Sequence, residues 1–399
     1  MLDGNENQAV AAVRSLDRAG HRVTVGADTT WSKAGWSRHA AASLRYPSPR
    51  REPDAFVRRL EDFVRAEPGT LVLPLTESST LRVSENRDRL FAAGARLALA
   101  DHDILLRAFD KDATRRIAES VGVATPRTRV VTTLDEARDA VEAIGLPAVL
   151  KALTSEETDA GGALRAAGAP LYARTPAQLD AAFDAMRRRS SRILVQEFIG
   201  GAGTGYFALM VNGQALAEFA HRRIRDVRPT GSGSAVRESI AVEPAMREAS
   251  LAILSELRFH GVAMVEFKRR ADGELVFLEV NGRFWNSLAL AIHAGVDFPA
   301  LLADVADHGD ATSPPPYRVG VRCRWFLGDA RHLAAVLAGP PAAFPGRFPG
   351  RLRTLLAFLT PTPGMRHDNF SLADPLPELG DWVHFLFRRV PAALGRRAA

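Results

Sequence analysis

Two glutamates and an asparagine in the second half of the chain form its clearest chemical pattern. Asp272-Gly273 is typical of a two-residue hairpin turn, and such a turn pairs Glu266 directly with Glu279. Asn281 lies on the same face, because strand side chains alternate with a period of two. Two carboxylates and an amide oxygen that converge in this way favour a hard divalent cation, Mg²⁺ or alternatively Mn²⁺.

Opposed carboxylates destabilise a strand pair, so the arrangement needs a compensating cation or a shared proton. The alternative is a solvated hairpin face on which two glutamates happen to oppose each other. The neighbouring residues, 262–265 and 276–278, are apolar, which argues against a solvated face. Arg283, two residues past Asn281, is placed to reach the same site and bind a phosphate oxygen.

Lysines are rare in this chain and therefore informative. Of 52 basic residues only four are lysines, and the bias towards arginine and alanine is typical of a GC-rich bacterial coding background. A lysine in that background marks a position where a compact ammonium is favoured over a planar guanidinium. The four are Lys33, Lys111, Lys151 and Lys268.

A basic segment precedes the carboxylate hairpin. Alternation along a strand places His221, Arg223 and Arg225 on one face and Arg222 on the other, next to a Gly/Ser-rich loop at 229–234. The first face is suited to a γ-phosphate or an acyl phosphate, with a solvated basic loop as the alternative. His221 is expected to be structural rather than a catalytic base. Aromatic residues for base stacking are not interleaved, which disfavours nucleic acid.

The elements that position these residues fall into two patterns. Residues 1–105 alternate helical and extended segments, which predicts a doubly wound parallel sheet, although few residues precede the first turn. Beyond them the pattern changes to helices, a glycine-rich loop at 154–169 and two hairpins. The expected elements are helices at 8–18, 56–64, 111–121, 134–144 and 244–257, strands at 21–25, 70–74 and 147–152, and hairpins at 206–220 and 262–280.

Composition places the chain among ordinary soluble globular proteins. It has 399 residues, 46% hydrophobic and 25% charged, and its pI near 9.9 reflects a net charge of only +6. The lone Cys323 excludes a disulfide framework and favours a reducing compartment. An apolar run of about 18 residues, long enough to span a membrane, is not found. We expect a cytoplasmic protein without stable membrane insertion or a nucleic-acid partner.

Residues 106–310, with the α/β region before them, resemble the ATP-grasp superfamily, particularly the branch of the carbamoyl-phosphate synthase large chain and biotin carboxylase. The resemblance rests on several motifs in order rather than on one. They are Phe109-Asp110-Lys111-Asp112, Leu146-Pro147-Ala148-Val149-Leu150-Lys151, Val195-Gln196-Glu197-Phe198-Ile199, and the set Glu266, Glu279, Asn281 and Arg283.

The resemblance implies a fold of mixed α/β and α+β class in three parts. These are a Rossmann-like N-terminal domain at 1–105, a two-lobed ATP-grasp domain at 106–310 with a lid at about 120–190, and a small C-terminal extension at 311–399. The tail around 382–389 is expected to be a packed helix, with an amphipathic contact to a membrane surface or a partner as the alternative.

The resemblance also implies an ATP site with Mg²⁺. Lys111 and Lys151 would hold phosphates, and Gly161 and Gly162 would cover the triphosphate with backbone amides. The segment 195–199, called the hinge, would pair with adenine through its backbone. The residues implied to bind ATP are Lys111, Lys151, Gly161, Gly162, Glu197, Phe198 and Ile199. A ribose-binding glutamate that several relatives place seven residues after the hinge glutamate is replaced by Thr204.

Glu266, Glu279 and Asn281 would bind the metal, and Arg283 and Arg223 would be catalytic. The expected activity is that of an ADP-forming ligase that joins a small-molecule carboxylate to an amine through an acyl phosphate. Two alternatives remain: activation of bicarbonate or carbamate through carboxyphosphate, and a nucleotide-binding regulatory protein without turnover. The oligomeric state is open, with a homodimer as one option.

Overall fold

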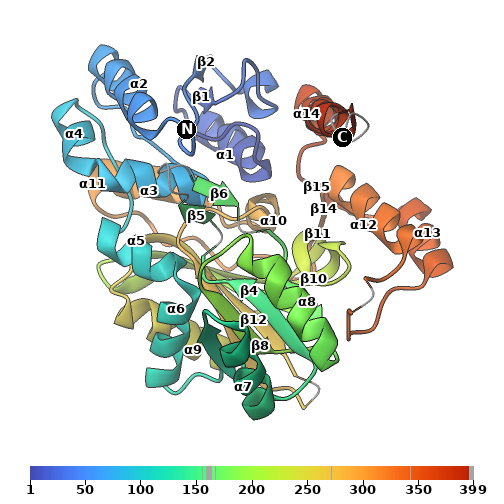
Figure 1. The fold of residues 1–399 in the computed structure, drawn as a ribbon. Coiled ribbons are helices and arrows are strands. Elements are labelled where there is room, and N and C mark those ends of the chain that lie inside the picture. Colours follow the sequence, from blue (N-terminus) through green and yellow to red (C-terminus); the bar gives the residue numbers. More distant parts are fainter. Residues whose placement is uncertain (155, 159–163, 167, 271, 342, 395–399) are drawn as a thin grey trace.

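The computed structural model describes residues 1–399 except 155, 159–163, 167, 271, 342 and 395–399 (Figure 1). Its main element, here called the large sheet, has seven strands in the order β13-β12-β9-β10-β11-β14-β15. Neighbouring strands are antiparallel except for β14 and β15. The strands are β9 Gly203–Val211, β10 Gln214–Arg228, β11 Ser232–Ile240, β12 Gly261–Arg269, β13 Leu275–Asn281, β14 Arg322–Arg324 and β15 Arg366–His367.

Strand β9 lies near the middle of the large sheet, and all of its residues are buried. Its alternate side chains enter two hydrophobic clusters, one on each face. One face is covered by α5 His102–Phe109, α6 Lys111–Ser120 and α9 Pro244–Glu256, and the other by α10 Leu288–Ala294 and α11 Phe298–His308 together with α1 Asn7–Arg18. Helices on both faces explain why the strand has no alternation of polar and apolar residues.

A second, small sheet has the strand order β3-β8-β4-β7 and is antiparallel throughout. Two helices cover one of its faces with a hydrophobic cluster of their own. The elements are β3 Thr128–Val131, α7 Leu134–Ile144, β4 Ala148–Ala152, β7 Leu171–Ala173, α8 Pro176–Arg187 and β8 Ile193–Glu197. The small sheet therefore packs as a separate layer in front of the large one (Figure 1).

The segment at 154–169, predicted to be a glycine-rich loop, is partly regular, so this prediction is wrong in part. It contains the paired strands β5 Glu156–Thr158 and β6 Leu164–Ala166. A periodicity argument misses such a pair because each strand is only three residues long. Gly161 and Gly162 lie outside the described residues.

The N-terminal region has the predicted alternation of helices and extended segments. Its sheet is smaller than the doubly wound sheet that this alternation predicts. The parallel strands β1 Thr24–Ala27 and β2 Ala42–Arg45 are the regular pair, and 70–74 contributes a single bridge between Leu71 and Arg96. The Leu2 amide donates to the Leu73 carbonyl at 2.8 Å, so the first residues occupy the place of a strand. The helices are α2 Pro53–Ala66, α3 Glu77–Glu85 and α4 Arg87–Ala92.

The last ninety residues continue the main body. Strands β14 and β15 extend the large sheet beyond residue 310, where the predicted ATP-grasp domain ends; the domain limits themselves stay predictions. The helices are α12 Phe326–Ala338, α13 Arg351–Leu359 and α14 Leu376–Leu394, and α14 lies against the short helix η1 Ala34–Trp36. The expected tail helix is present; residues 382–385 are partly buried in it, whereas Leu386 and Phe387 are exposed.

Buried polar side chains join the two ends of the chain. Lys33 Nζ lies 2.8 Å from Asp381 Oδ1, with both side chains at most 5% exposed. Arg14 Nε donates to Asp374 Oδ2 at 2.8 Å, and its terminal nitrogens donate to backbone carbonyls of the same segment. We call this contact the terminal seam; its residues are Arg14, Lys33, Ser37, Asp368, Asn369, Asp374 and Asp381.

The length and composition of the helices bear on whether any of them could cross a membrane. Among the described residues, no single helix is both long and apolar enough to cross a bilayer. Helices α10 and α11 reach such a length only together, across a bend of 88°.

Candidate active site

A cavity of about 330 Å³ lies between the small sheet and the large sheet. Most of the residues expected to act together line it, although they come from segments up to 170 residues apart. These are Lys111, Lys151, Glu197, Phe198, Ile199, Arg223, Glu266, Glu279, Asn281 and Arg283. Of the predicted site residues, Gly161 and Gly162 are the ones that lie outside the described part of the chain.

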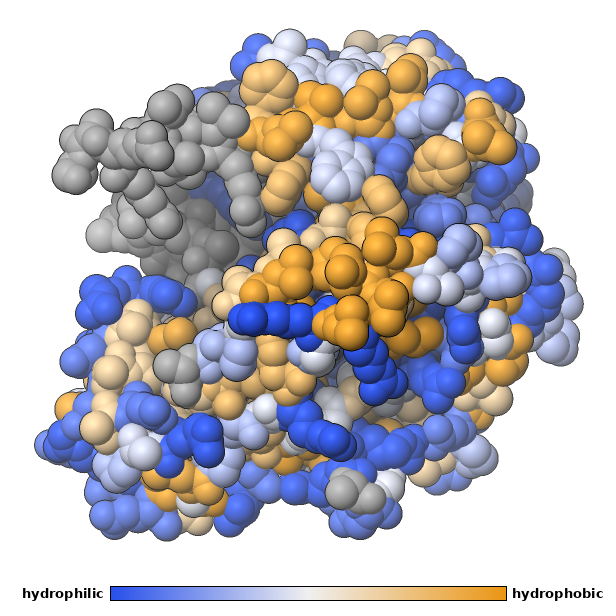
Figure 2. Space-filling view, turned by 90° about the vertical axis from the view of Figure 1, so that its right-hand side faces the viewer, coloured by the Kyte–Doolittle hydropathy of each residue, from blue (hydrophilic) through white to orange (hydrophobic). Residues whose placement is uncertain are grey.

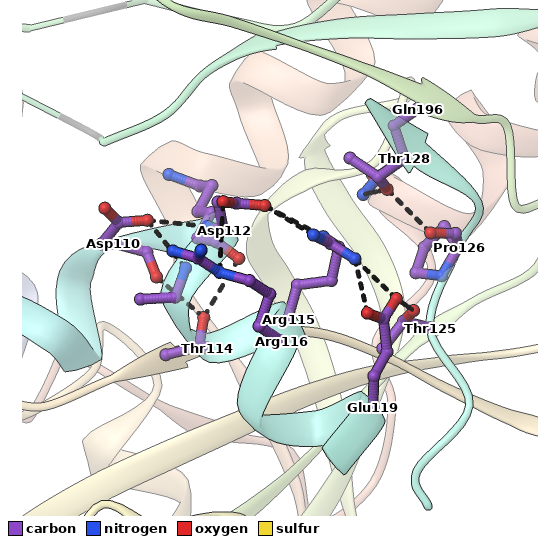
Figure 3. A network of polar contacts seen from close by, with 12 residues as sticks. Asp110, Asp112, Thr114, Arg115, Arg116, Glu119, Thr125, Pro126, Thr128 and Gln196 are labelled. Carbon is purple, nitrogen blue, oxygen red and sulfur yellow. Dashed lines mark hydrogen bonds and ion pairs between the residues drawn. The ribbon is translucent and has the colours of Figure 1, made fainter. Parts of the chain in front are cut away.

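The N-terminus of α6, close to the predicted helix start at 111, is fixed by a cap at Asp110 (Figure 3). Asp110 Oδ1 accepts hydrogen bonds from the amides of Asp112 and Ala113 at 2.8 and 2.9 Å. The backbone of Lys111 also donates to the Leu153 carbonyl at 3.2 Å, next to the end of β4. The cap therefore starts the helix where the Lys111 side chain reaches the cavity.

The hairpin β12/β13 has the predicted pairing of Glu266 with Glu279, for a different reason. Arg270 donates its amide to the Glu274 carbonyl at 2.9 Å, so these two residues close the turn, which is one residue longer than predicted. A bulge at Leu278 then absorbs one residue and restores the predicted register at the glutamates. Both errors concern one residue, and they cancel.

Cations compensate the two carboxylates, as the opposed pair requires. Arg223 Nη2 donates to Glu266 Oε2 at 2.6 Å, and Lys111 Nζ lies 3.8 Å from Glu279 Oε2. Burial alone would raise the pKa of Glu279, but Lys111 and Lys151 nearby outweigh it and lower that pKa. Asn281 Nδ2 donates to Glu279 Oε1 at 3.3 Å, so the three predicted metal ligands are adjacent.

The ammonium of Lys151 is hydrogen-bonded to an amide rather than to a carboxylate. Its ammonium donates to Gln196 Oε1 at 2.8 Å, and Gln196 is in turn held by Thr128 at 3.1 Å. Burial lowers the pKa of Lys151 to about 8, so it is mostly protonated at neutral pH. A protonated lysine that has no carboxylate partner at hydrogen-bond distance among the described residues suits an incoming anion.

Lys268 lines the same cavity and was not singled out for the site from the sequence. It donates to the Ile199 carbonyl at 2.8 Å and lies over the Phe198 ring at 5.6 Å, and burial lowers its pKa. Three of the four lysines therefore meet in one cavity. Their rarity was the signal that could have found Lys268.

The basic strand is bent by irregular pairing on both sides of Arg225, which makes one prediction wrong. Arg225 does not share the face of His221 and Arg223, because the irregularity turns it to Asp329, with bonds of 2.6 and 2.7 Å. Asp226 takes a place near Arg223, at 3.7 Å. Burial raises the pKa of Asp226 to about 6.

His221 is buried beside the cavity. Its Nε2 lies 2.7 Å from the hydroxyl of Ser287, and burial lowers its pKa well below the usual value. The ring is therefore neutral at physiological pH, which fits the expected structural role. Its Nδ1 has no hydrogen-bond partner among the described residues.

The hinge residues 197–199 line the cavity, and the carboxylate of Glu197 is already bound by an arginine. Arg270 hydrogen-bonds Glu197 at 2.8 Å and lowers the pKa of that carboxyl to about 2. The Phe198 amide donates to the Pro147 carbonyl at 3.3 Å. Thr204, at the position where a ribose-binding glutamate would stand, is buried and donates to the His221 carbonyl at 3.0 Å.

An aromatic cluster closes the hinge side and was not predicted. Phe198 of the hinge and Tyr172 of β7 contact Phe344, with ring centroids 5.9 and 5.2 Å apart. Phe344 belongs to the C-terminal segment, about 150 residues away in sequence. No local pattern reveals a contact between such distant residues.

Comparison with known proteins gives one family model and several relatives. Residues 191–328 match the model described as ATP-grasp in the biosynthetic pathway with Ter operon. The carbamoyl-phosphate synthase large chain of Myxococcus xanthus is 30% identical over 213 residues, which cover 50% of this chain and 19% of the relative. The chain spans between 11 and 36% of the length of the curated relatives it matches.

Solved structures share the fold at low identity. An L-amino acid ligase from Bacillus licheniformis has a TM-score of 0.60 at 17% identity, covering 78% of this chain and 74% of its own. An N5-carboxyaminoimidazole ribonucleotide synthetase in its ADP complex has a TM-score of 0.63 at 14% identity, covering 90% and 95%. At these identities the likeness shows the fold, and it confirms the mixed α/β architecture predicted above.

Proposed function

This chain is an ATP-grasp protein of the carbamoyl-phosphate synthase and biotin carboxylase branch, and on that premise we propose that it is an ATP- and Mg²⁺-dependent ligase that joins a carboxylate to an amine. A substrate carboxylate oxygen attacks the γ-phosphorus and ADP leaves; the amine nitrogen then attacks the acyl carbon and phosphate leaves. The observation that carries the proposal is the convergence of Glu266, Glu279, Asn281, Lys111 and Lys151 on one cavity.

The acidic residues fit a Mg²⁺ ion. Glu266, Glu279 and Asn281 offer oxygen ligands only, and the described residues contain no cluster of three or more His, Cys, Asp or Glu side chains. Two carboxylates and one amide leave coordination positions for water and phosphate oxygens, as Mg²⁺ prefers. When bound there, the ion would neutralise charge on the transferred phosphoryl group.

Cations on the other walls would hold the phosphates. Lys111, Lys151 and Lys268 line the cavity together with Arg283, whose Nη2 donates to Asn281 Oδ1 at 3.1 Å. That bond orients the guanidinium beside the metal ligands, where it would stabilise the developing charge. Arg223, which donates to Glu266, would act from β10, on the other side of β9 from the strands that carry the metal ligands.

The hinge supports an adenine site. Glu197, Phe198 and Ile199 line one end of the cavity, and Phe344 packs on Phe198 with 5.9 Å between ring centroids. The apolar side chains of Phe198 and Ile199 suit contact with a planar base. We propose that ribose recognition does not involve Thr204, because its hydroxyl is bound to the His221 carbonyl.

The other substrates would enter from a second cavity of about 320 Å³. Asn286 lines both cavities, so they adjoin at the end that carries Arg283 and Ser287. The second cavity is formed between the N-terminal segment 5–7 and helices α12 and α14. We propose that small-molecule carboxylate and amine substrates bind there. We also propose that the enzyme is cytoplasmic.

Trapping the intermediate tests the proposal. ADP release is measured with ATP, Mg²⁺ and pools of amino acids and other carboxylates, and hydroxylamine is added in place of the amine. An acyl phosphate forms a hydroxamate whenever the correct carboxylate is present. ADP release that no carboxylate stimulates, with no hydroxamate in any pool, would contradict the ligase.

Carboxyphosphate formation is the second candidate, and the 30% identity to a carbamoyl-phosphate synthase large chain favours it. In that case bicarbonate alone would stimulate ADP release and no substrate hydroxamate would form. A regulatory protein without turnover would bind ATP and release no ADP under any condition. The convergence of Glu266, Glu279, Asn281, Lys111 and Lys151 on one cavity supports turnover.

A further inference from the structure

Helix α13 exposes leucines on most of its circumference. Leu352, Leu356 and Leu359 are 69%, 55% and 63% exposed, and Leu355 is also exposed. Thr354 is the residue of this nine-residue helix that is buried. A helix that packs only for stability buries its apolar face, so this one presents leucine to something outside the chain.

The exposed surface extends over the neighbouring helices. The Phe358 ring stacks on Phe326 of α12 with centroids 5.7 Å apart, and Phe326 lies 6.0 Å from Trp382 of α14. Figure 2 faces this side of the molecule and shows hydrophobic residues gathered over it, with hydrophilic residues around them. We call this the leucine surface; its exposed members are Phe326, Leu337, Leu352, Leu355, Leu356, Leu359, Leu376 and Leu379.

The charge around α13 has one sign, whereas α14 places Glu378 between Leu376 and Leu379. Residues 330–367 contain five arginines and no aspartate or glutamate, although the chain as a whole carries 52 basic and 46 acidic residues. Arg351 and Arg353 lie on α13 itself, and both are exposed. A basic rim around exposed leucines is complementary to an anionic, apolar layer.

We propose that the leucine surface binds an anionic lipid membrane from one side, as a peripheral contact. Leucine is under-represented among the residues that dominate protein interfaces, whereas leucine with arginine is typical of helices that lie in the headgroup layer. Arginine stems extend along the apolar layer while the guanidinium reaches the phosphates. The proposal is independent of the ligase activity, because none of these residues lines the ATP cavity.

Sedimentation of the full chain with vesicles tests this. We expect binding to phosphatidylcholine vesicles that contain phosphatidylglycerol, little binding to pure phosphatidylcholine, and weakening by salt. Leu352→Glu with Leu356→Glu should weaken binding by more than about tenfold. Leu106→Glu is the matched control, since Leu106 is 49% exposed on α5, and it should bind like the parent.

A second pair of variants separates charge from apolar contact. Arg351→Gln and Arg353→Gln should each weaken binding to the anionic vesicles by about fivefold. Circular dichroism and thermal melting confirm that each variant is folded. Sedimentation with neither kind of vesicle would overturn the proposal. So would a dimer of the parent that the two leucine substitutions convert to a monomer, because a second copy would then cover the surface.

Discussion

Buried charges meet in two regions of this protein, and the two are built differently. At the terminal seam each charge has a close partner: Lys33 lies 2.8 Å from Asp381 and Arg14 lies 2.8 Å from Asp374. In the cavity between the two sheets Arg223 and Glu266 form one close pair, at 2.6 Å, but the lysines have looser contacts. Lys111 lies 3.8 Å from Glu279, and Lys151 donates to an amide rather than a carboxylate.

The difference indicates which region waits for a ligand. Described charged residues that line the cavity include five cations against three carboxylates, and one of those carboxylates, Glu197, is engaged by Arg270 outside. An excess of positive charge in a buried space is costly unless an anion neutralises it. The seam needs no such partner, because its charges are already paired and hydrogen-bonded.

Asp381→Asn should have the largest effect, and that effect is on stability. The substitution leaves Lys33 buried without its carboxylate, which costs about 3–5 kcal/mol. The free energy of unfolding from urea titration checks this, with the exposed Asp184→Asn as control. The KM for ATP of the folded fraction should not change. A large change in that KM would contradict the separation of the terminal seam from the ATP site.

Glu279→Gln should have the opposite signature. We expect ADP formation to fall about 100-fold, because the metal loses a charged ligand. The melting temperature should change little, since the carboxylate both attracts Lys111 and opposes Glu266. Glu274→Gln, on the same hairpin with a side chain that is 50% exposed, is the matched control. Equal turnover in both variants would remove the metal assignment.

Lys151→Met should weaken ATP binding about tenfold, as expected for one phosphate contact. Stability should be retained, because this lysine donates to a neutral amide, Gln196, rather than to a buried carboxylate. Calorimetry with a non-hydrolysable ATP analogue gives the affinity. An affinity within about twofold of the parent would place Lys151 with the structural charges of the seam.

The pH dependence of that affinity is a finer test. The pKa of Lys151 is about 8, so its positive charge is present below that pH and lost above it. Affinity for the analogue should therefore fall by about fivefold from pH 7 to pH 9. Lys151→Met should show a flat profile over this range. A parent profile equally flat would contradict the role of this ammonium.

Asn286→Ala should have the smallest effect. Asn286 lines both cavities, so its loss should raise the KM for a carboxylate or amine substrate by about threefold, as one neutral hydrogen bond does. The KM for ATP should stay constant. Steady-state kinetics with each substrate varied in turn distinguishes the two, and a change confined to ATP would separate the second cavity from the reaction.

Local chemistry made much of the site predictable. The helix start at Asp110, the strand end at Lys151 and the opposed pair Glu266 and Glu279 follow from short-range rules. Lys111, next to the cap, lines the cavity together with Lys151 and both glutamates. The hairpin also shows a limit of such rules. Its turn is one residue longer than predicted, and only the bulge at Leu278 keeps the pairing.

Long-range packing accounts for what the sequence could not predict. Phe344 contacts the hinge from the C-terminal segment, and Arg225 turns to Asp329 about a hundred residues later. Neither follows from periodicity, because the partner is not encoded nearby. The small parallel sheet of the N-terminal region is likewise completed by Met1 and Leu2, which form no recognisable strand.

The terminal seam also bears on synthesis of the chain. Arg14 and Lys33 leave the ribosome first, whereas their partners Asp374 and Asp381 leave about 350 residues later. At roughly 5–20 residues per second, these cations stay solvated for tens of seconds before the native contact exists. A nascent chain stalled before residue 368 therefore lacks the groups that seal its N-terminal region, and chaperones have that interval in which to hold it.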